Sequence, residues 1–216
     1  MLLKRGLRNV AVQGVTQLTV AKSRIAGPAY TLRYIPARED LDVLEVFKDP
    51  EHPQRAAVER IPPEHVLVMD CRGDASAASA WAILAARLQY RGCAGIVTDG
   101  GIRDSETIAE MDMPVFCGGA SAPANLTRHH AVDINQPVGC GNVAVYPGDI
   151  IVGDADGVIV VPAELADDIA AEAPAMTRFE DWAMEKVVQG RGIVGLYPPD
   201  DKTSREYQLE IDGSVE

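Results

Sequence analysis

Cysteines, aromatic residues and long apolar runs are all scarce in this 216-residue sequence. The four cysteines (Cys71, Cys93, Cys117 and Cys140) are more than twenty residues apart and form no Cys-x-x-Cys pair. This spacing excludes a zinc knuckle or a dithiol redox motif and predicts buried thiols. No apolar run approaches the roughly 20 residues of a membrane span. The start, Met1–Arg5, leads into polar sequence and not into a signal-peptide core, so we expect a cytoplasmic protein that contacts no membrane.

Basic residues and histidines are also too few for several classes of function. Twenty Lys and Arg against 32 Asp and Glu give a net charge of −12, and the basic residues are scattered, which argues against a nucleic-acid groove. Four irregularly spaced histidines provide neither a histidine metal site nor a Ser-His-Asp triad. His129-His130 is predicted to be a surface or interface pair in a helical context. No lysine stands at a predicted strand end in the core, which disfavours Schiff-base chemistry.

The residues that are abundant describe an α/β protein. Hydrophobic residues make up 47%, and 19 glycines with 14 prolines indicate many turns between aliphatic strands and Ala-rich helices. The length fits one domain with an appended segment. We expect one domain over residues 1–196 and a C-terminal segment over 197–216 that is a polar arm or disordered. The start lies so close to a helical fragment that we expect the N-terminus to be clipped or to be assigned too late in the chain.

Hydrophobic periodicity predicts alternating strands and helices in the first half of the chain. The expected strands are 24–35, 66–70, 95–98 and 114–117, and the expected helices are 41–47, 52–61, 76–91 and 105–111. Strand 66–70, helix 76–91 and strand 95–98 form a βαβ unit with parallel strands, so Asp70 and Asp99 should leave the sheet at the same edge.

The pattern changes in the second half. Short apolar runs separated by turn residues predict antiparallel hairpins over 138–161. The turn 154–157 lacks the remaining ligands of a calcium loop and is predicted to be a plain hairpin turn. A long amphipathic helix follows over 163–186, with Pro174 as a predicted kink.

The most informative segment is 92–104, in which a buried strand delivers charge to a turn built from Asp99-Gly100-Gly101. Ligands bind at the carboxyl ends of strands in layered α/β folds, so Arg103 and Asp104 are candidate site residues. The N-terminal amides of the helix that begins at Asp104 or Ser105 add a weak anion site beside Arg103. The alternative is that Arg103 and Asp104 only form surface ion pairs.

Five motifs together resemble the RraA-like family, which contains regulators of ribonuclease activity and 4-hydroxy-4-methyl-2-oxoglutarate aldolases. They are Arg72-Gly73-Asp74, the run 91–104, Pro114-Val115-Phe116, Pro147-Gly148-Asp149 and the run 153–158. The resemblance implies a swivelling β/β/α fold: a mixed sheet with a central parallel βαβ unit and antiparallel hairpins. It also implies ring-shaped homotrimers, sometimes stacked as hexamers, with active sites between subunits.

The aldolase branch of the family implies roles for individual residues. Arg103 would bind pyruvate, and Asp104 would ligate Mg²⁺ or Mn²⁺ through a water-rich shell. Where the aldolases have Gly-Asp/Glu-Leu, this chain has Trp81-Ala82-Ile83, whose backbone amides could still bind a carboxylate. The acidic group is missing at Ala82, and the candidates to replace it are Asp74, Asp99 and a neighbouring subunit's Glu180. The expected catalytic set is therefore Arg103, Asp104 and Asp99.

These residue types favour a class II-like lyase that forms a pyruvate enolate. Its reactions would be retro-aldol cleavage of a 4-hydroxy-2-oxo acid, decarboxylation of oxaloacetate, or both, and its partner a small 2-oxo acid. Decarboxylation depends less on the missing acid, because no alcohol has to be deprotonated. The alternatives are a non-catalytic regulator that binds a ribonuclease or helicase, and an enzyme acting on a 2-keto-3-deoxy sugar acid.

Overall fold

The computed structural model describes residues 1–19 and 24–212, which form two compact units. The first, the α/β unit, covers residues 2–164, and the second, the C-terminal unit, starts at Leu165. The division therefore precedes α4 (Ala166–Val188), whereas the sequence predicted a boundary after residue 196. The physical reason is that α4 buries little apolar surface, with Ala183 its one buried residue.

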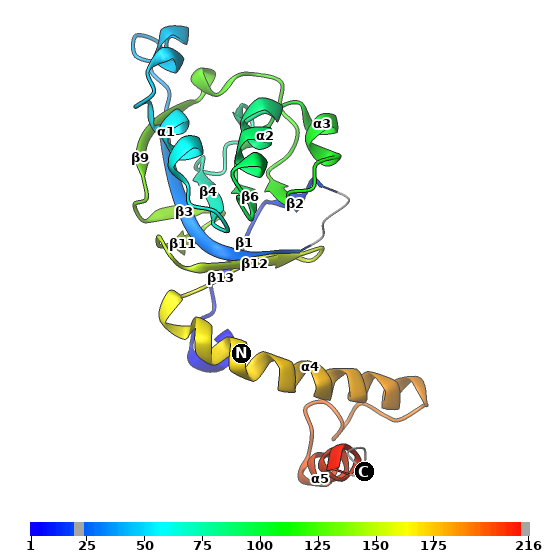
Figure 1. The fold of residues 1–216 in the computed structure, drawn as a ribbon. Helices are drawn as coiled ribbons and strands as arrows, with labels where there is room; N and C mark the ends of the chain where they lie inside the picture. Colours follow the sequence, from blue (N-terminus) through cyan, green and yellow to red (C-terminus); the bar gives the residue numbers. More distant parts are fainter. Residues whose placement is uncertain (20–23, 213–216) are drawn as a thin grey trace. The chain divides into compact units, whose positions relative to one another are not determined.

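The centre of the α/β unit is a parallel βαβ arrangement, as predicted. Strands β4 (Val66–Asp70), β6 (Gly95–Thr98) and β8 (Val115–Cys117) are neighbours in one sheet and run parallel. Helix α2 (Ala82–Tyr90) lies in the connection from β4 to β6 (Figure 1). Asp70 and the residue after Thr98 therefore leave the sheet at the same edge.

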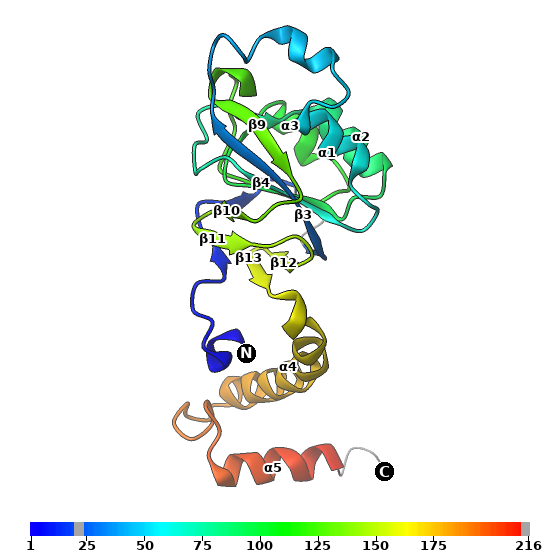
Figure 2. The same ribbon diagram turned by 90° about the vertical axis from the view of Figure 1, so that its left-hand side faces the viewer.

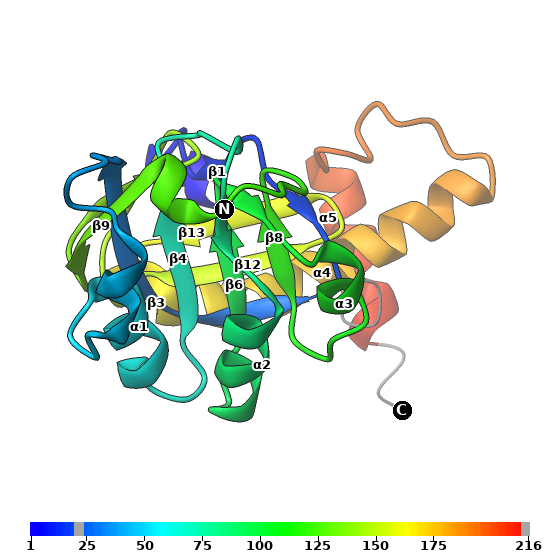
Figure 3. The same ribbon diagram turned by 90° about the horizontal axis from the view of Figure 1, so that it is seen from above.

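Alternation along β4 shows how the layers form. Leu67 and Met69 pack in a core cluster with the helices, and Val66 and Val68 pack in a second cluster on the opposite face. The helices α1 (Pro53–Arg60), α2 and α3 (Ser105–Ala109) lie together on one side of the parallel strands (Figure 3). A strand with no polar face is expected where both faces of a sheet are covered.

The second β layer consists of antiparallel hairpins, again as predicted (Figure 2). It contains β10 (Val138–Cys140), β11 (Val143–Val145), β12 (Ile150–Asp154) and β13 (Gly157–Val161). The turn 154–157 is the hairpin turn between β12 and β13. Two β layers and one helical layer confirm the β/β/α expectation.

One long strand joins the two β layers. Strand β3 (Ile25–Pro36) pairs antiparallel with β12 in its first part, parallel with β4 in its middle and antiparallel with β9 (His129–Ile134) at its end. The sheet order is β1-β13-β12-β3-β4-β6-β8-β2, with β9 beside β3. The remaining short strands are β1 (Ala11–Val12), β2 (Thr16–Gln17), β5 (Ala78–Ala80) and β7 (Gly101–Ile102).

Several local predictions were wrong. The helix predicted from residue 76 begins only at Ala82, because the preceding residues pair as β5 with β7. The predicted helix 41–47 is a short 3-10 helix, Leu44–Lys48. The pair His129-His130 lies in strand β9, where His129 is fully buried and His130 pairs with Asp42. The prediction for the cysteines is confirmed, since all four are buried and free.

The C-terminal unit consists of two helices and an aromatic cluster. Helix α4 continues through Pro174, and α5 (Asp201–Asp212) occupies most of the predicted polar arm. The rings of Phe179, Trp182 and Tyr207 lie within 6 Å of one another, with centroid distances of 5.1 to 5.8 Å. Across residues 1–19 and 24–212, no helix combines the length and apolar character required to cross a membrane.

Candidate active site

The glycines after β6 are required by close packing. An added Cβ on Gly100 would lie 2.5 Å from the Sγ of Cys71, and one on Gly101 would lie 2.5 Å from the Cβ of Ser121. Because real Cβ atoms do not approach this closely, only glycine lets the chain pass here and pair as β7 with β5. This packing fixes the backbone immediately before Arg103.

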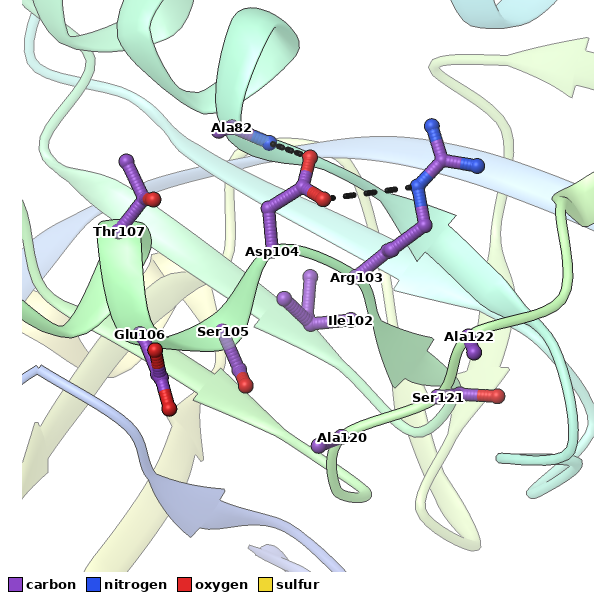
Figure 4. Close-up of a pocket in the computed structure, with 10 residues that line it drawn as sticks. All are labelled: Ala82, Ile102, Arg103, Asp104, Ser105, Glu106, Thr107, Ala120, Ser121 and Ala122. Carbon is purple, nitrogen blue, oxygen red and sulfur yellow. Dashed lines mark hydrogen bonds and ion pairs between the residues drawn. The ribbon is translucent and has the colours of Figure 1, made fainter.

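Arg103 and Asp104 emerge together from the end of β7. The Arg103 N–H donates to the Ala80 carbonyl at 3.1 Å, and Asp104 adopts a left-handed backbone (φ 60°, ψ 39°) before α3 begins. The Asp104 Oδ1 lies 3.7 Å from the Arg103 Nε, and Oδ2 accepts a hydrogen bond from the Ala82 N–H at 3.3 Å (Figure 4). The two predicted residues and the start of α2 are therefore brought together.

These groups line an open cavity of about 650 Å³. Both charged side chains are accessible, with 38% of Arg103 and 42% of Asp104 exposed. Sequence reasoning missed most of the lining, although three of its residues directly follow Asp104. The cavity is lined by Ala82, Ile102, Arg103, Asp104, Ser105, Glu106, Thr107, Ala120, Ser121 and Ala122.

The predicted substrate-binding segment 81–83 is only partly in place. Ala82 lines the cavity, but its N–H already donates to Asp104. Ile83 is 75% exposed and is not a lining residue. Trp81 is the N-cap residue of α2, and its ring centroid lies 5.3 Å from the guanidinium carbon of Arg103. The N–H groups of residues 83 and 84 precede the first intrahelical hydrogen bonds and provide positive partial charge at this end of α2.

Asp99 occupies a different environment from Asp104. It is 4% exposed and accepts hydrogen bonds from the N–H groups of Cys71 (2.6 Å), Gly73 (2.9 Å) and Gly141 (3.0 Å). Burial raises the pKa of Asp99, against the opposite effect of these three donors. The geometry thus favours a structural role that joins three loops over the predicted catalytic one.

The other acids considered for proton transfer also have local partners. The Asp74 carboxylate accepts hydrogen bonds from the side chain and N–H of Ser76, which lower the pKa of Asp74. Glu180, in the C-terminal unit, accepts a hydrogen bond from the Tyr197 hydroxyl at 2.7 Å. Glu106 lines the cavity, but its carboxylate points away from Asp104 (Figure 4).

A magnesium-type ion is compatible with this donor set. Mg²⁺ keeps several waters and takes only one or two protein carboxylates, so one accessible aspartate beside an open cavity is sufficient. In the part of the chain that the structure describes, no group of three or more His, Cys, Asp or Glu side chains could hold a metal ion. Asp104 is thus the protein ligand that a water-rich site at this cavity would use.

Comparison with known proteins places this architecture in a family. A family model described as "RraA-like: Aldolase/RraA" matches residues 2–160. This chain belongs to the RraA-like family. A protein of Halalkalibacterium halodurans named putative 4-hydroxy-4-methyl-2-oxoglutarate aldolase is 32% identical over 184 residues, which cover 82% of this chain and 81% of that protein.

Solved structures of RraA-like proteins share the fold. The crystal structure of Streptomyces coelicolor RraAS2, described as an unusual member of the RNase ES inhibitor RraA protein family, superposes with a TM-score of 0.74 at 31% identity. That superposition covers 85% of this chain and 87% of RraAS2. An uncharacterized protein from Pseudomonas syringae superposes with a TM-score of 0.77 at 22% identity. The superposition covers 91% of this chain and 84% of that protein, and at this identity it supports only a shared fold. The RraA-like family thus includes relatives named as aldolases and relatives named as RNase inhibitors.

Proposed function

We propose that this RraA-like protein is a divalent-metal-dependent carbon–carbon lyase that releases pyruvate from a 2-oxo acid. The observation that carries the proposal is the joint placement of Arg103 and Asp104 at one cavity beside the start of α2. Relatives named putative 4-hydroxy-4-methyl-2-oxoglutarate aldolase support this class of reaction. The proposed substrates are 4-hydroxy-2-oxo acids, oxaloacetate, or both.

Arg103 performs the binding step in this proposal. Its guanidinium is planar, carries several N–H donors and is exposed to the cavity, so it can bind the carboxylate and the keto oxygen of a 2-oxo acid. Asp104 would hold Mg²⁺ or Mn²⁺, which supplies a Lewis acid for developing negative charge on oxygen. The N–H groups at the start of α2 add positive partial charge on the same side.

The bond that breaks is the one between C3 and C4 of the 2-oxo acid. In decarboxylation CO₂ leaves, the electron pair of this bond forms the enolate of pyruvate, and a proton then adds at C3. In retro-aldol cleavage a base must first remove the proton of the C4 hydroxyl. Asp104, the acid bonded to the Ala82 N–H, is assigned to the metal in this proposal, and the Glu106 carboxylate points away from Asp104. Because neither acid is placed to serve as that base, we expect decarboxylation to be the more robust activity.

Release of pyruvate from oxaloacetate and from 4-hydroxy-4-methyl-2-oxoglutarate, with Mg²⁺ or Mn²⁺, tests the proposal. We expect rates above those of the metal alone, and a loss of at least about 100-fold in Asp104→Asn, because the variant keeps the shape of the side chain but loses its charge. Asp112→Asn, which changes an exposed aspartate after α3, is the matched control and should keep full activity. No pyruvate above the metal-only rate would refute the proposal.

A regulator that acts by binding a ribonuclease is the second candidate, favoured by the likeness to RraAS2. The two functions differ in how they depend on Asp104. Saturable Mn²⁺ binding that disappears in Asp104→Ala would favour the lyase. Tight binding of a ribonuclease that this substitution leaves unchanged would favour the regulator. We further propose a homotrimer or hexamer in the cytoplasm, which sedimentation and fractionation would test.

A further inference from the structure

A second arginine lies near the candidate active site and has no acidic partner. Arg55, on α1, is half-buried, and its guanidinium carbon lies 4.4 Å from the ring centroid of Phe47 and 5.1 Å from that of Trp81. Within residues 1–19 and 24–212 its guanidinium forms neither an ion pair nor a hydrogen bond, and burial lowers the pKa of Arg55. Contacts with two aromatic rings hold the guanidinium while leaving its N–H donors free.

Arg87 and Arg103 of the α/β unit also contact an aromatic ring, and each has an acid nearby. Arg87 is a useful comparison, because it lies 5.5 Å from the ring centroid of Tyr90 and also pairs with Glu59 at 2.7 Å. Arg55 has the aromatic contacts without the carboxylate. A partly buried, unpaired guanidinium is costly unless an anion joins it, which makes Arg55 a candidate to bind one.

The ring of Trp81 contacts both Arg55 and Arg103, and Arg103 lines the cavity. The guanidinium carbons of Arg55 and Arg103 lie 5.1 and 5.3 Å from the same ring centroid, so they are at most about 10 Å apart. A five-carbon dicarboxylate spans about 5 Å between its terminal carbons, and a charge-assisted hydrogen bond adds about 2.8 Å at each end. Such a ligand is therefore long enough to span the distance between the two guanidiniums.

We propose that Arg55 binds the second carboxylate of a dicarboxylic 2-oxo acid whose first carboxylate is held by Arg103. This inference rests on the proposed function for the role of Arg103 and adds the residue that selects dicarboxylic over monocarboxylic substrates. Arg55 acts as a specificity residue, since it lies away from the bond that breaks. It should affect binding of the dicarboxylic acid and leave binding of pyruvate unchanged.

Calorimetric titration of the whole chain with 2-oxoglutarate and with pyruvate, in the presence of Mg²⁺, tests this proposal without turnover. We expect the wild type to bind 2-oxoglutarate at least about tenfold more tightly than pyruvate. Arg55→Gln should lower the affinity for 2-oxoglutarate about 10- to 100-fold. Pyruvate affinity should stay within about twofold. Arg55→Lys should restore part of the preference, and Arg87→Gln should retain all of it. Thermal melting checks that each variant is folded.

The outcomes separate this inference from the proposed function. If Arg55→Gln weakens both acids equally, or neither, Arg55 does not select the second carboxylate, even if the wild type releases pyruvate. If the wild type binds 2-oxoglutarate through Arg55 but releases no pyruvate from any substrate, the lyase proposal fails and the role of Arg55 stands. A wild type without preference for the dicarboxylic acid overturns the role of Arg55 directly.

Discussion

Asp99 follows β6, Asp104 lies five residues later, after β7, and the two serve different regions of the α/β unit. Asp99 is buried, and its carboxylate accepts hydrogen bonds from three backbone N–H groups. Asp104 lies at the open cavity beside Arg103, and its carboxylate accepts one hydrogen bond, from the Ala82 N–H at the start of α2. The chemistry of the residue is the same in both positions, so its role is decided by whether backbone or solvent surrounds it.

Substitution of Asp99 is expected to give the largest effect that tests this comparison, a loss of stability. Asp99→Ala leaves three N–H groups without their acceptor, two of them in the buried residues Cys71 and Gly141, and we expect the free energy of unfolding to fall by about 4 kcal/mol. Urea unfolding measures it. Asp104→Asn is the control and should change the stability by less than about 0.5 kcal/mol. Equal losses at the two positions would contradict the division of roles.

A smaller effect is expected in the pH dependence of stability. Burial raises the pKa of Asp99, so the native carboxyl keeps its proton to a higher pH than the unfolded one, whose value is near 3.8. The contribution of this group to stability is therefore full below that value and is lost as the pH rises through the native pKa.

Asp99→Asn removes this titration, and comparison with the wild type isolates it from the other carboxyl groups. Because the wild type alone loses stability in this interval, its free energy of unfolding relative to the variant should decrease from about pH 4 upward and then become constant. Urea unfolding at a series of pH values measures the difference. A difference that rises with pH would show that the three N–H donors outweigh burial.

The smallest effect concerns the backbone at position 104. With φ at 60°, Asp104 is in the left-handed region, which glycine adopts without steric cost. Both Asp104→Gly and Asp104→Ala lose the carboxylate, so their difference reports the backbone alone. We expect the glycine variant to be more stable by about 1 kcal/mol in thermal or urea unfolding. Equal stability would mean that the turn relaxes in the alanine variant.

Much of the fold could be predicted because apolar periodicity and turn residues act locally. The run Val66–Asp70 has no polar face, which indicated a strand covered on both sides, and the structure confirms it. The helix start was predicted too early because the pairing of β5 with β7 is made by residues more than twenty positions apart. The two compact units divide at Leu165, a position that the amphipathic pattern of α4 does not indicate, because such a pattern does not reveal what covers a helix.

The candidate site was predicted in part. Asp-Gly-Gly followed by Arg103 and Asp104 indicated charge at a strand end, and the structure brings both side chains to one cavity. The catalytic role of Asp99 stays a prediction. Its carboxylate accepts a hydrogen bond from the N–H of Gly141, 42 residues along the chain, which no local pattern connects to it. Arg55 could not be found from the sequence, because its nearness to Trp81 depends on how α1 packs beside α2.

The pairing of strand β3 affects how the α/β unit unfolds. Its first residues are bonded to β12, its middle to β4 and its last to β9, so one continuous backbone segment belongs to both β layers. Unfolding of either layer would remove hydrogen bonds from β3, the strand with which the other layer also pairs. We therefore expect the two layers to unfold together in one cooperative transition, and not as separately folding modules.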